Sequence, residues 1–555
     1  MRHIIVRHRT SLEGADPAFS DRSYRALSGA GLLAAEPPPQ FADSVVPLFG
    51  ETLAESVYLS GLFAPPALCS GIGRCGLCRL RYLGDPPPPL DAEKAVLSEH
   101  DLDAGWRLGC RRDPLPGAHV LVPALPANAA AAAMRSRESW PPAPDGGPFG
   151  LAVDLGTTSI HWRFVSLGGD SQTPLPHGIM TNPQMGAGSD VISRLARASS
   201  PDGAAALRRL VIDALSRVIA HAGENGYATE ELCVAGNPAM NAILLGLETG
   251  SLARAPYGLP DPGGRVAVVP DLPPLYLPPH ISPFVGADIS AGYAALALDP
   301  DGAKPEYPFL LADLGTNGEC VLALSEERAL TASLPMGPAL EGVNLAFGCE
   351  AVPGAITDYA LTPSGLAPSV LGGGAPVGVS ATGYLSLLRS LRAAGLLAED
   401  GRFSPPENPL SRRLGGAVHT GGEPSLRLPG RMILFASDVE EILKVKAAFS
   451  LAVSRLLREA ALPAAGVRRV FLAGSLGSHA PVAALTDLGF LPAVLGPRTA
   501  FAGNTSLAGA ALFLLHKKTR ARCEAWARKV LPLDLAGDPS FAAEYARHMA
   551  FAWRA

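Results

Sequence analysis

Cys69-Ser-Gly-Ile-Gly-Arg-Cys75-Gly-Leu-Cys78 is the stretch that decides the fold of the N-terminal part of the chain, and Cys110 follows after 31 further residues. Four thiolates are the ligands of a [2Fe–2S] cluster, and the spacing departs by one residue from the plant-type ferredoxin pattern C-x4-C-x2-C. The three glycines of the loop tolerate positive φ, so the loop can curl and direct its N–H groups at the cluster sulfurs. The sequence therefore predicts an iron–sulfur site.

The size and composition of the chain limit the classes of protein that it can belong to. A chain of 555 residues is long enough for two or more domains with sizeable cores. It contains 48% hydrophobic and 17% charged residues, as globular proteins do. The formal net charge of -5 gives no reason to expect a nucleic-acid partner.

The N-terminal stretch and the cysteine content indicate where the protein works. The first ten residues, MRHIIVRHRT, lack the apolar core of a signal peptide, and no uninterrupted apolar run of about 18 residues occurs later in the chain. We therefore expect a cytoplasmic protein with no membrane partner. In a reducing compartment the eight cysteines are unsuited to disulfides, and those outside the cluster motif are expected in the core. These are Cys233, Cys320, Cys349 and Cys523.

The elements around the cysteines are typical of a β-grasp ferredoxin domain, which we place at residues 41–123. Residues 1–40 are assigned to an N-terminal extension of unknown role. The predicted elements are a strand at 44–49, a helix at 53–61 capped by Thr52, strands at 79–83 and 119–122, and a helix from Asp91 to about His100. The alternatives for the cysteines are a zinc site or a chance spacing.

Residues 124–148 are rich in alanine and proline. Such a composition predicts a linker that is semi-rigid where proline dominates. It could let the cluster domain swing relative to the C-terminal remainder of the chain.

The remaining sequence contains an internal duplication. Leu151-Ala-Val-Asp154-Leu-Gly156-Thr157-Thr158 leads from an apolar strand through a Gly-Thr turn into a second, alternating strand at 160–164. The same unit recurs at 310–319, where Asp313 precedes Leu-Gly-Thr-Asn-Gly-Glu. Two related strand-turn-strand units predict two similar α/β lobes, which we place at 149–300 and 301–555.

Two further segments support this duplication. Gly286-Ala-Asp288-Ile-Ser-Ala291-Gly292 has the same frame of small residues as Gly503-Asn504-Thr-Ser-Leu-Ala508-Gly509, which would let two helices cross closely at a hinge. Phe471-Leu-Ala-Gly474-Ser475-Leu-Gly477-Ser478 reads as a strand that ends in a glycine turn. We expect the two lobes to face each other across a cleft.

The repeated strand-turn-strand unit has the groups needed to bind the phosphates of a nucleotide. The N–H groups and hydroxyls of the turn can point at phosphate oxygens, while the carboxylate before the turn reaches a hydrated Mg²⁺. Asp154 and Asp313 would then approach one triphosphate from opposite sides, and glycines 474 and 477 would leave room for adenosine. The sequence contains no GxxxxGK[ST] motif, so a P-loop is excluded. It also lacks the HExxH motif of zinc proteases and the GxSxG motif of serine hydrolases.

This ordered set resembles the ATPase superfamily of acetate and sugar kinases, Hsp70 and actin, whose two lobes have an RNase H-like fold. Its combination with an N-terminal [2Fe–2S] domain resembles the reductive activators of corrinoid proteins, from about Phe41 to the C-terminus. The segments that add to the resemblance are 182–194, 234–240, 337–342, 351–356 and 538–541. Two departures are the five residues between the first two cysteines and Gly-Ser-Leu-Gly in place of Gly-Gly-Phe-Gly at 474–477.

The resemblance implies an ATPase coupled to electron transfer. Its cofactors would be a [2Fe–2S] cluster, ATP and Mg²⁺, and it would pass one electron to the Co(II) form of a corrinoid protein to restore Co(I) for methyl transfer. Its partners would be that corrinoid protein, from a methyltransferase system, and an upstream low-potential electron donor. A homodimer is left open.

The expected site residues fall into three groups. Asp154 and Asp313 hold the water shell of Mg²⁺, and Asp288 orients the attacking water, with Glu319 as the alternative. Asp288 has a simpler interpretation as a charge at a helix N-terminus. The cluster ligands are Cys69, Cys75, Cys78 and Cys110. The nucleotide-binding residues are Gly156, Thr157, Thr158, Gly315, Thr316, Asn317, Gly318, Gly474, Ser475 and Gly477.

Three other functions remain open at this point. An activator of a radical dehydratase belongs to the same superfamily, although such activators typically share one cluster across a dimer. A small-molecule kinase would not need the cysteines. A nucleotide-gated redox carrier or sensor would bind ATP without turnover, against which the two aspartates weigh.

Overall fold

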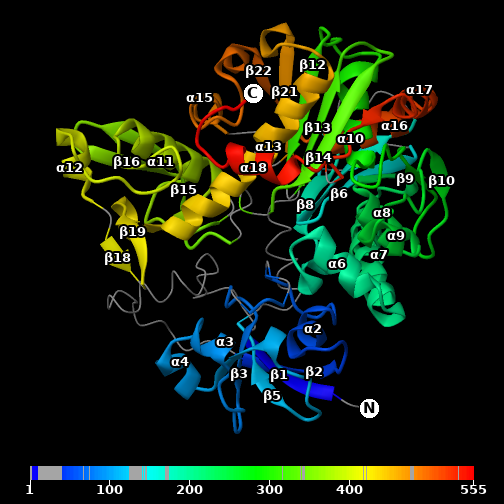
Figure 1. Cartoon of the computed structure of the whole chain (residues 1–555). Helices are drawn as coiled ribbons and strands as arrows, with labels where there is room; N and C mark the ends of the chain where they lie inside the picture. Colours follow the sequence, from blue (N-terminus) through cyan, green and yellow to red (C-terminus); the bar gives the residue numbers. More distant parts are fainter. Residues whose placement is uncertain are drawn as a thin grey trace. The chain divides into compact units, whose positions relative to one another are not determined.

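In the computed structural model, the chain forms two compact units (Figure 1). The first unit contains the N-terminal part of the chain up to Lys304 together with Thr505–Arg528, and the second contains Pro305–Asn504 and Lys529–Ala555. The structure describes residues 3–9, 41–66, 68–69, 71–73, 75–123, 140–141, 143, 147–168, 174–315, 317–337, 339, 344–349, 351–416, 418–420, 422–474, 480–535 and 537–555.

The N-terminal part of the first unit is built on a five-stranded mixed sheet with the order β2-β1-β5-β3-β4 (Figure 1). The central strands β1 and β5 are parallel, and the other neighbours are antiparallel. This is the β-grasp arrangement that the sequence predicts. The elements are β1 (His3–Arg9), β2 (Phe41–Pro47), α2 (Leu53–Tyr58), β3 (Arg79–Tyr82), α3 (Asp91–Lys94), α4 (Glu99–Asp103), β4 (Trp106–Leu108), the 3₁₀ turn η1 (Gly109–Arg111) and β5 (His119–Leu121).

The sheet begins earlier in the sequence than we expected. Strand β1 lies within the residues that we assigned to an extension of unknown role, yet it pairs with both β2 and β5. Its side chains Ile4 and Val6 are fully buried in the core of this sheet. Burial of two branched apolar side chains stabilises the domain by about 3–6 kcal/mol, so β1 is part of its core. Residues 10–40 lie outside the described part of the chain.

Capping residues explain where the helices of this domain begin. The Thr52 side chain accepts the N–H of Glu55, and the Glu55 side chain accepts the N–H of Thr52, which is a complete capping box. The predicted helix from Asp91 to His100 is wrong as a single element. It is divided into α3 and α4, because Ser98 caps a new helix by accepting the N–H of Asp101.

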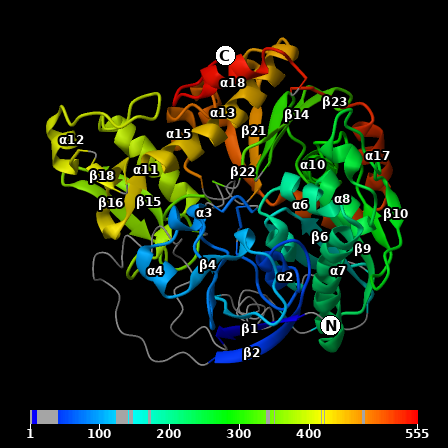
Figure 2. The same ribbon diagram turned by 60° about the horizontal axis from the view of Figure 1, so that its bottom comes forward.

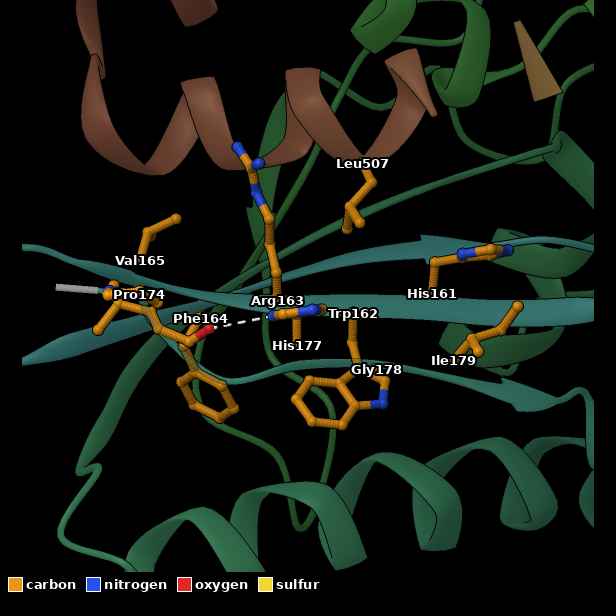
Figure 3. Close-up of a pocket in the computed structure, with 11 residues that line it drawn as sticks. His161, Trp162, Arg163, Phe164, Val165, Pro174, His177, Gly178, Ile179 and Leu507 are labelled. Atoms are coloured by element: carbon orange, nitrogen blue, oxygen red, sulfur yellow. Dashed lines mark hydrogen bonds between the residues drawn. The ribbon is translucent and has the colours of Figure 1, made fainter. Parts of the chain in front are cut away.

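The rest of the first unit is a six-stranded sheet with the order β10-β11-β9-β6-β7-β8. Helices α7 and α8 share a hydrophobic core with β6, β7 and β9 (Figure 2). Helix α16 contacts the same strands from the side away from Trp162 and Phe164 (Figure 3). The strands are β6 (Phe149–Leu155), β7 (Ser159–Ser166), β8 (His177–Thr181), β9 (Thr229–Gly236), β10 (Arg265–Ala267) and β11 (Leu275–Leu277).

The helices that accompany the six-stranded sheet come from two distant parts of the sequence. They are η2 (Pro183–Ala187), α6 (Val191–Ala198), α7 (Pro201–Glu224), α8 (Pro238–Leu245), α9 (Gly250–Ala253), α10 (Ala287–Tyr293), the π-helical turn η3 (Ala294–Leu298), α16 (Thr505–Leu515) and α17 (Lys518–Ala527). The predicted division at residue 300 therefore needs a correction. Helices α16 and α17 belong to the first unit, because α16 packs on β6, β9 and α10.

The second unit repeats this plan with the sheet order β22-β21-β12-β13-β14-β23. Its strands are β12 (Phe309–Leu314), β13 (Asn317–Ala323), β14 (Ala329–Pro335), β15 (Ala355–Thr362), β16 (Gly365–Val370), β17 (Gly378–Val379), β18 (Val418–Thr420), β19 (Glu423–Arg427), β20 (Ile433–Phe435), β21 (Arg469–Ala473), β22 (Thr499–Gly503) and β23 (Leu531–Pro532). Its helices are α11 (Ala381–Ala393), α12 (Pro409–Leu414), η5 (Pro429–Arg431), α13 (Ala436–Glu459), η6 (Ala464–Gly466), α15 (Val482–Asp487), η7 (Ala493–Arg498) and α18 (Phe541–His548).

The two large sheets confirm the internal duplication. In the first, β6 is parallel to β9 and antiparallel to β7, which is antiparallel to β8. In the second, β12 has the same relations to β21, β13 and β14. Asp154 and Asp313 are the partly exposed residues in otherwise buried strands, so both sheets present a carboxylate at the same place.

The C-terminal segment is anchored to the long helix of the second unit. Arg455 of α13 forms ion pairs at 2.5 Å with both Asp538 and Glu544, and α18 lies beside α13 (Figure 1). The pairing with Arg458 and with Arg455 lowers the pKa of the Glu544 carboxyl. The segment 538–541 therefore has a structural role, since it helps to hold the C-terminal segment against α13.

Several described residues of the predicted linker contact the first unit. Trp140 packs against Trp162 with a ring-centroid distance of 5.4 Å, and the Tyr227 hydroxyl donates to the carbonyl of Pro141 at 2.7 Å. This end of the segment is therefore fixed by side-chain packing. Residues 124–139 lie outside the described part.

The predicted burial of the four cysteines outside the cluster motif has a mixed outcome. Cys233, Cys320 and Cys523 are buried as predicted, whereas Cys349 is only half-buried. None of the described helices combines the length and the apolar composition needed to cross a membrane.

Small residues allow the close crossing of α10 and α16, as the sequence predicts. A Cβ atom at Gly509 would overlap the backbone carbonyl of Ala291. We expect Gly509→Ala to lower the free energy of unfolding of the first unit by about 1–3 kcal/mol, because the helices must move apart. Denaturant unfolding followed by circular dichroism measures this change.

The matched control is Gly223→Ala. Gly223 lies on the exposed face of α7, and an added Cβ would meet nothing within 4 Å. That change is expected to raise stability by up to about 1 kcal/mol through helix propensity alone. Equal effects of the two substitutions would contradict the close crossing.

Candidate functional site

The cysteine loop adopts the backbone conformation that its glycines predict. Gly71, Gly73 and Gly76 have φ angles of +80°, +81° and +76°. The backbone N–H of Leu77 donates to the sulfur of Cys75 at 3.5 Å. This left-handed backbone is strained for other residues, so the glycines determine the shape of the loop.

The four predicted cluster cysteines come together as two pairs of thiols. Cys69 and Cys75 are hydrogen-bonded to each other, and so are Cys78 and Cys110. The neighbouring thiol and then burial raise the pKa of Cys75 and also the pKa of Cys78. Sulfurs crowded in this way resist joint ionisation unless positive charge binds among them. The arrangement therefore fits a metal cluster.

The spread of the sulfurs distinguishes a cluster from a single zinc ion. Among the described residues, no three of these cysteines have sulfur atoms that all lie within 4.8 Å of one another. One tetrahedral zinc, with Zn–S bonds of about 2.3 Å, would draw all four sulfurs closer than that. Two separate pairs of sulfurs suit more than one metal ion better than a single ion, so an iron–sulfur site is favoured over zinc.

Basic and aromatic side chains surround the cysteines. The Arg111 side chain packs against Gly73, and its guanidinium donates to the carbonyl of Gly71 at 3.4 Å. Burial is the main cause of the raised pKa of Tyr58, and the neighbouring Cys78 and Cys75 add to it. A positive charge beside thiolates stabilises their ionised form.

In the first unit, the predicted nucleotide residues form one hydrogen-bonded turn between β6 and β7. The Ser506 hydroxyl of α16 donates to the Asp154 carboxylate at 2.8 Å. The Thr157 hydroxyl accepts from the Asn237 side chain at 3.1 Å. The side chain and the backbone N–H of Asn182 donate to the carbonyls of residues 156 and 158, both at 2.8 Å. The turn that we predict to bind phosphate is thus held from three directions.

Arg194 is a residue of this site whose role the sequence did not reveal. Its fully buried guanidinium donates to the carbonyl of Thr157, to the carbonyl of Gly188 at 3.2 Å and to the Gln184 side chain at 3.3 Å. A buried charge needs such partners, because leaving it unpaired would cost several kcal/mol. Arg194 therefore fixes the turn from the protein interior. Its presence in the motif 182–194 was the only signal in the sequence.

The same segment also touches the cysteine domain within the first unit. The N–H of Ser189 donates to the carbonyl of Leu68, which precedes Cys69, at 3.2 Å. The Arg197 side chain lies over the Phe49 ring at 4.9 Å and approaches the Glu55 carboxylate at 3.7 Å. The turn at 183–190 thus contacts the cysteine loop on one side and Arg194 on the other.

Asp288 lies at the start of α10, as the helix-end interpretation predicts, and it is also close enough to Asp154 to interact with it. Its carboxylate accepts the N–H of Ile289 at 2.9 Å. Burial, and then the charge of Asp154, raise the pKa of Asp288 to about 7. A carboxylate with a raised pKa is a better proton acceptor. The location therefore suits either interpretation.

In the second unit, Asp313 lies at the end of β12 directly opposite Glu319 of β13. The N–H of Gly315 donates to the carbonyl of Asn317 at 3.3 Å, which closes the turn. Gly318 lies under Met336, since a Cβ there would meet the Met336 sulfur at 2.6 Å. Thr316, Ser475 and Gly477 lie outside the described residues, so their placement stays a prediction.

Gly474 follows β21 and lies against Asp313. Its φ is +86°, and a Cβ atom there would lie 2.5 Å from an Asp313 carboxylate oxygen. We expected this glycine to leave room for adenosine, and the structure adds that it leaves room for the aspartate. Asp154 and Asp313 lie in different units, so their approach to one triphosphate also stays a prediction.

Fold and site together define a class of protein. The duplicated sheet, with an aspartate at the end of each central strand, is that of the actin, Hsp70 and sugar-kinase ATP-binding domains, here joined to a β-grasp domain with a four-cysteine site. The family model described as "RACo middle region" matches residues 149–301, and that described as "C-terminal domain of RACo the ASKHA domain" matches residues 308–554. Both regions of the chain after residue 148 thus match models of the RACo family.

Two relatives and one solved structure agree with this assignment. The chain is 28% identical over 437 residues to the corrinoid activation enzyme RamQ of Eubacterium limosum, covering 73% of this chain and 70% of RamQ. It is 26% identical over 409 residues to the [Co(II) methylated amine-specific corrinoid protein] reductase of Methanosarcina barkeri, covering 66% and 70%. The structure of a reductive activator for a corrinoid, iron–sulfur protein has a TM-score of 0.64 at 22% identity, covers 93% of this chain and 97% of its own, and shows the shared fold.

Replacing one cysteine of a pair tests the cluster site. We expect Cys75→Ser to lose most bound iron and the visible absorption of the cluster, because serine is a poor replacement for a thiolate ligand. Iron analysis and absorption spectra of the anaerobically purified protein measure the loss. The control Cys349→Ser, at a half-buried cysteine outside the site, should keep both. Retention of full iron by Cys75→Ser would contradict the assignment.

Gly474→Ala tests the contact with Asp313. We expect weaker Mg-ATP binding, by about tenfold or more, because the new methyl group displaces the carboxylate. Gly422→Ala is the matched control, since Gly422 also has a φ of +86° but an added Cβ would meet nothing within 4 Å. Both substitutions strain the backbone by a similar amount. Titration with Mg-ATP should separate them, and equal affinities would remove the proposed role of the contact.

Proposed function

We propose that this protein is an ATP-dependent reductive activator of a corrinoid protein. It passes one electron to Co(II) in the bound corrinoid and so restores Co(I) for methyl transfer. The observation that carries this proposal is the presence, in one chain, of a four-cysteine site and a duplicated aspartate-bearing ATPase fold. The names of the two relatives, a corrinoid activation enzyme and a Co(II) corrinoid protein reductase, supply the acceptor.

The cysteine pairs support a [2Fe–2S] cluster in particular. Cys69 and Cys75 would hold one iron, and Cys78 and Cys110 the other. When bound, such a cluster supplies one electron at a potential of about −400 mV. The chain contributes the shape of the loop, the N–H of Leu77 and the charge of Arg111. These groups stabilise negative charge on the sulfurs and so tune the site.

The two aspartates are proposed to bind Mg-ATP from the two units. Asp154, oriented by the Ser506 hydroxyl, and Asp313, next to Gly474, would each hold water molecules of a hydrated Mg²⁺. The hydroxyls and N–H groups of residues 156–158 and 315–318 would bind the phosphates, while the glycine turn at 474–477 receives the adenosine. Mg²⁺ usually keeps several waters in such sites, so the two carboxylates would hold it through its water shell.

ATP is needed because electron transfer from the cluster to Co(II) is thermodynamically unfavourable. The Co(II)/Co(I) couple is expected to lie below the potential of the cluster, and each 59 mV of gap lowers the equilibrium constant of a one-electron transfer by about tenfold. Closure of the units on Mg-ATP would favour the state that engages the corrinoid protein, to the extent that ATP binds that state more tightly. Hydrolysis to ADP and phosphate then releases the reduced partner, and an upstream donor returns one electron to the protein.

Asp288 is the proposed residue that orients the attacking water. Its partly buried carboxylate has a pKa of about 7, raised by burial and by the charge of Asp154. Glu319 is the alternative and is buried in β13 opposite Asp313. A general base of this kind contributes roughly 10²–10⁴-fold to a rate.

An ATP-driven activator of another low-potential enzyme, such as a radical dehydratase, is the second candidate. Four cysteines in a single β-grasp domain, and not two per subunit, argue against it. A redox carrier or sensor without turnover is the third, and it would need no residue in the place of Asp288.

Substitution of Asp288 separates catalysis from binding. We expect Asp288→Asn to lower kcat for ATP hydrolysis by about 10²-fold or more while the affinity for Mg-ATP stays within a few-fold, because the amide keeps the shape but cannot accept a proton. Glu319→Gln is the parallel variant. A loss in kcat with Glu319→Gln and not with Asp288→Asn would reverse the assignment.

The proposed function is tested by the cobalt absorption of a Co(II) corrinoid protein mixed anaerobically with the reduced protein. We expect the Co(II) band to give way to the Co(I) band only with Mg-ATP, and neither Asp313→Ala nor Cys75→Ser to support the change. Hydrolysis of ATP without any change at cobalt would point to another acceptor. Absence of hydrolysis would leave a carrier or sensor.

A further inference from the structure

A cavity of about 580 Å³ lies against β7 and β8 in the first unit (Figure 3). Along β7, Arg163 and Val165 point to the side on which α16 runs, and Trp162 and Phe164 point the opposite way into the core. Leu507 reaches down from α16 towards the strands. This alternation follows from the two-residue repeat of a strand. The cavity therefore has a polar strand on one side and an apolar helix residue on the other.

Within the described part of the chain, the walls of the cavity carry basic groups and no acid. None of the 11 lining residues shown in Figure 3 is an aspartate or glutamate, whereas Arg163, His161 and His177 all line it. Val165, Ile179 and Leu507 supply apolar surface. Cavities of this size and mixed lining are typical of small-molecule sites.

Arg163 has no anionic partner within the described part of the chain. Its Nε–H is buried and has no hydrogen-bond acceptor among those residues, and burial alone lowers the pKa of the guanidinium. Other partly buried arginines are paired, for example Arg112 with Glu93 and Arg520 with Glu231. An unsatisfied buried donor costs about 1–3 kcal/mol, and more when it is charged. Nε itself is closed to solvent, so an anion in the cavity would compensate the charge of the guanidinium through its terminal N–H groups.

We propose that this cavity binds a small organic oxyanion, whose charged end pairs with Arg163 and whose apolar part lies against Val165, Ile179 and Leu507. The planar guanidinium matches the two oxygens of a carboxylate or of a phosphate monoester. The volume exceeds what inorganic phosphate alone would fill, and the apolar wall favours a ligand with a hydrocarbon or aromatic body.

The position of the cavity connects it to the nucleotide turn. Leu507 directly follows Ser506, whose hydroxyl holds the Asp154 carboxylate, and His161 lies opposite Asp154 in the β6–β7 pair. A ligand that moves Leu507 or His161 would therefore change the position of Asp154. The bound anion acts as an effector of ATP hydrolysis. This last consequence rests on the proposed function, while the binding itself does not.

Phenyl phosphate and benzoate are the probes that test the site, with phenol and inorganic phosphate as matched controls. Calorimetric titrations use the full-length protein with and without saturating Mg-ATP. We expect phenyl phosphate or benzoate to bind more tightly than either control, and Mg-ATP not to displace them. The probe that binds better identifies the ligand as a phosphate ester or a carboxylate.

Variants of the cavity make the test specific. Arg163→Gln should weaken binding by about tenfold or more, since a charge-assisted hydrogen bond is lost, and Arg163→Lys should weaken it less. Arg217→Gln, at an exposed arginine of α7, should change nothing. Leu507→Phe, which fills the cavity and keeps the charge, should also block binding if Arg163→Gln fails to fold.

Three results would overturn the proposal. They are the absence of binding of both probes at millimolar concentration, displacement of the probe by Mg-ATP, and unchanged affinity in both Arg163→Gln and Leu507→Phe. Each is measured without ATP hydrolysis or cobalt. A failure here is therefore distinguishable from a failure of the proposed function.

Discussion

The hydrogen bonds that the buried guanidinium of Arg194 donates are the interaction on which the first unit depends. They tie the backbone of Thr157, in the turn that we propose to bind phosphate, to the carbonyl of Gly188. The next residue, Ser189, donates to the carbonyl that precedes Cys69. A single charged side chain thus joins the proposed nucleotide turn to the segment that contacts the cysteine loop. Such a connection is stiff, because a buried charge cannot lose its partners without a large cost in free energy.

The duplicated sheet explains how one simple unit can occur on both sides of the proposed nucleotide site. Each copy ends its central strand with an aspartate beside a tight turn, at the carboxyl end of a parallel pair. The surroundings of the two aspartates then differ. Ser506 orients Asp154, whereas Asp313 faces Glu319 and the bare backbone of Gly474. Duplication has therefore preserved the carboxylate and the strand order, while the neighbours have changed.

The sequence predicted the parts of the fold that depend on local pattern. The cysteine loop, the Thr52 cap and the repeated hairpins follow from spacing, capping chemistry and alternation, and all three are present. Apart from the close crossing of α10 and α16, it did not predict contacts between distant segments. Strand β1 joins a sheet across more than 30 residues, and α16 packs with the first unit although it lies near the C-terminus. The roles of Arg194 and Ser506 were likewise hidden, since each depends on partners far away in the sequence.

The central claim is that one electron leaves the cysteine site for cobalt only when ATP is present. Single-turnover electron paramagnetic resonance tests it most directly, with pre-reduced protein, Co(II) corrinoid protein and no other reductant. The account predicts that the signals of the reduced cluster and of Co(II) disappear together, in equal amounts and only after Mg-ATP is added. Loss of the Co(II) signal while the cluster signal persists, or equal loss without ATP, would contradict it.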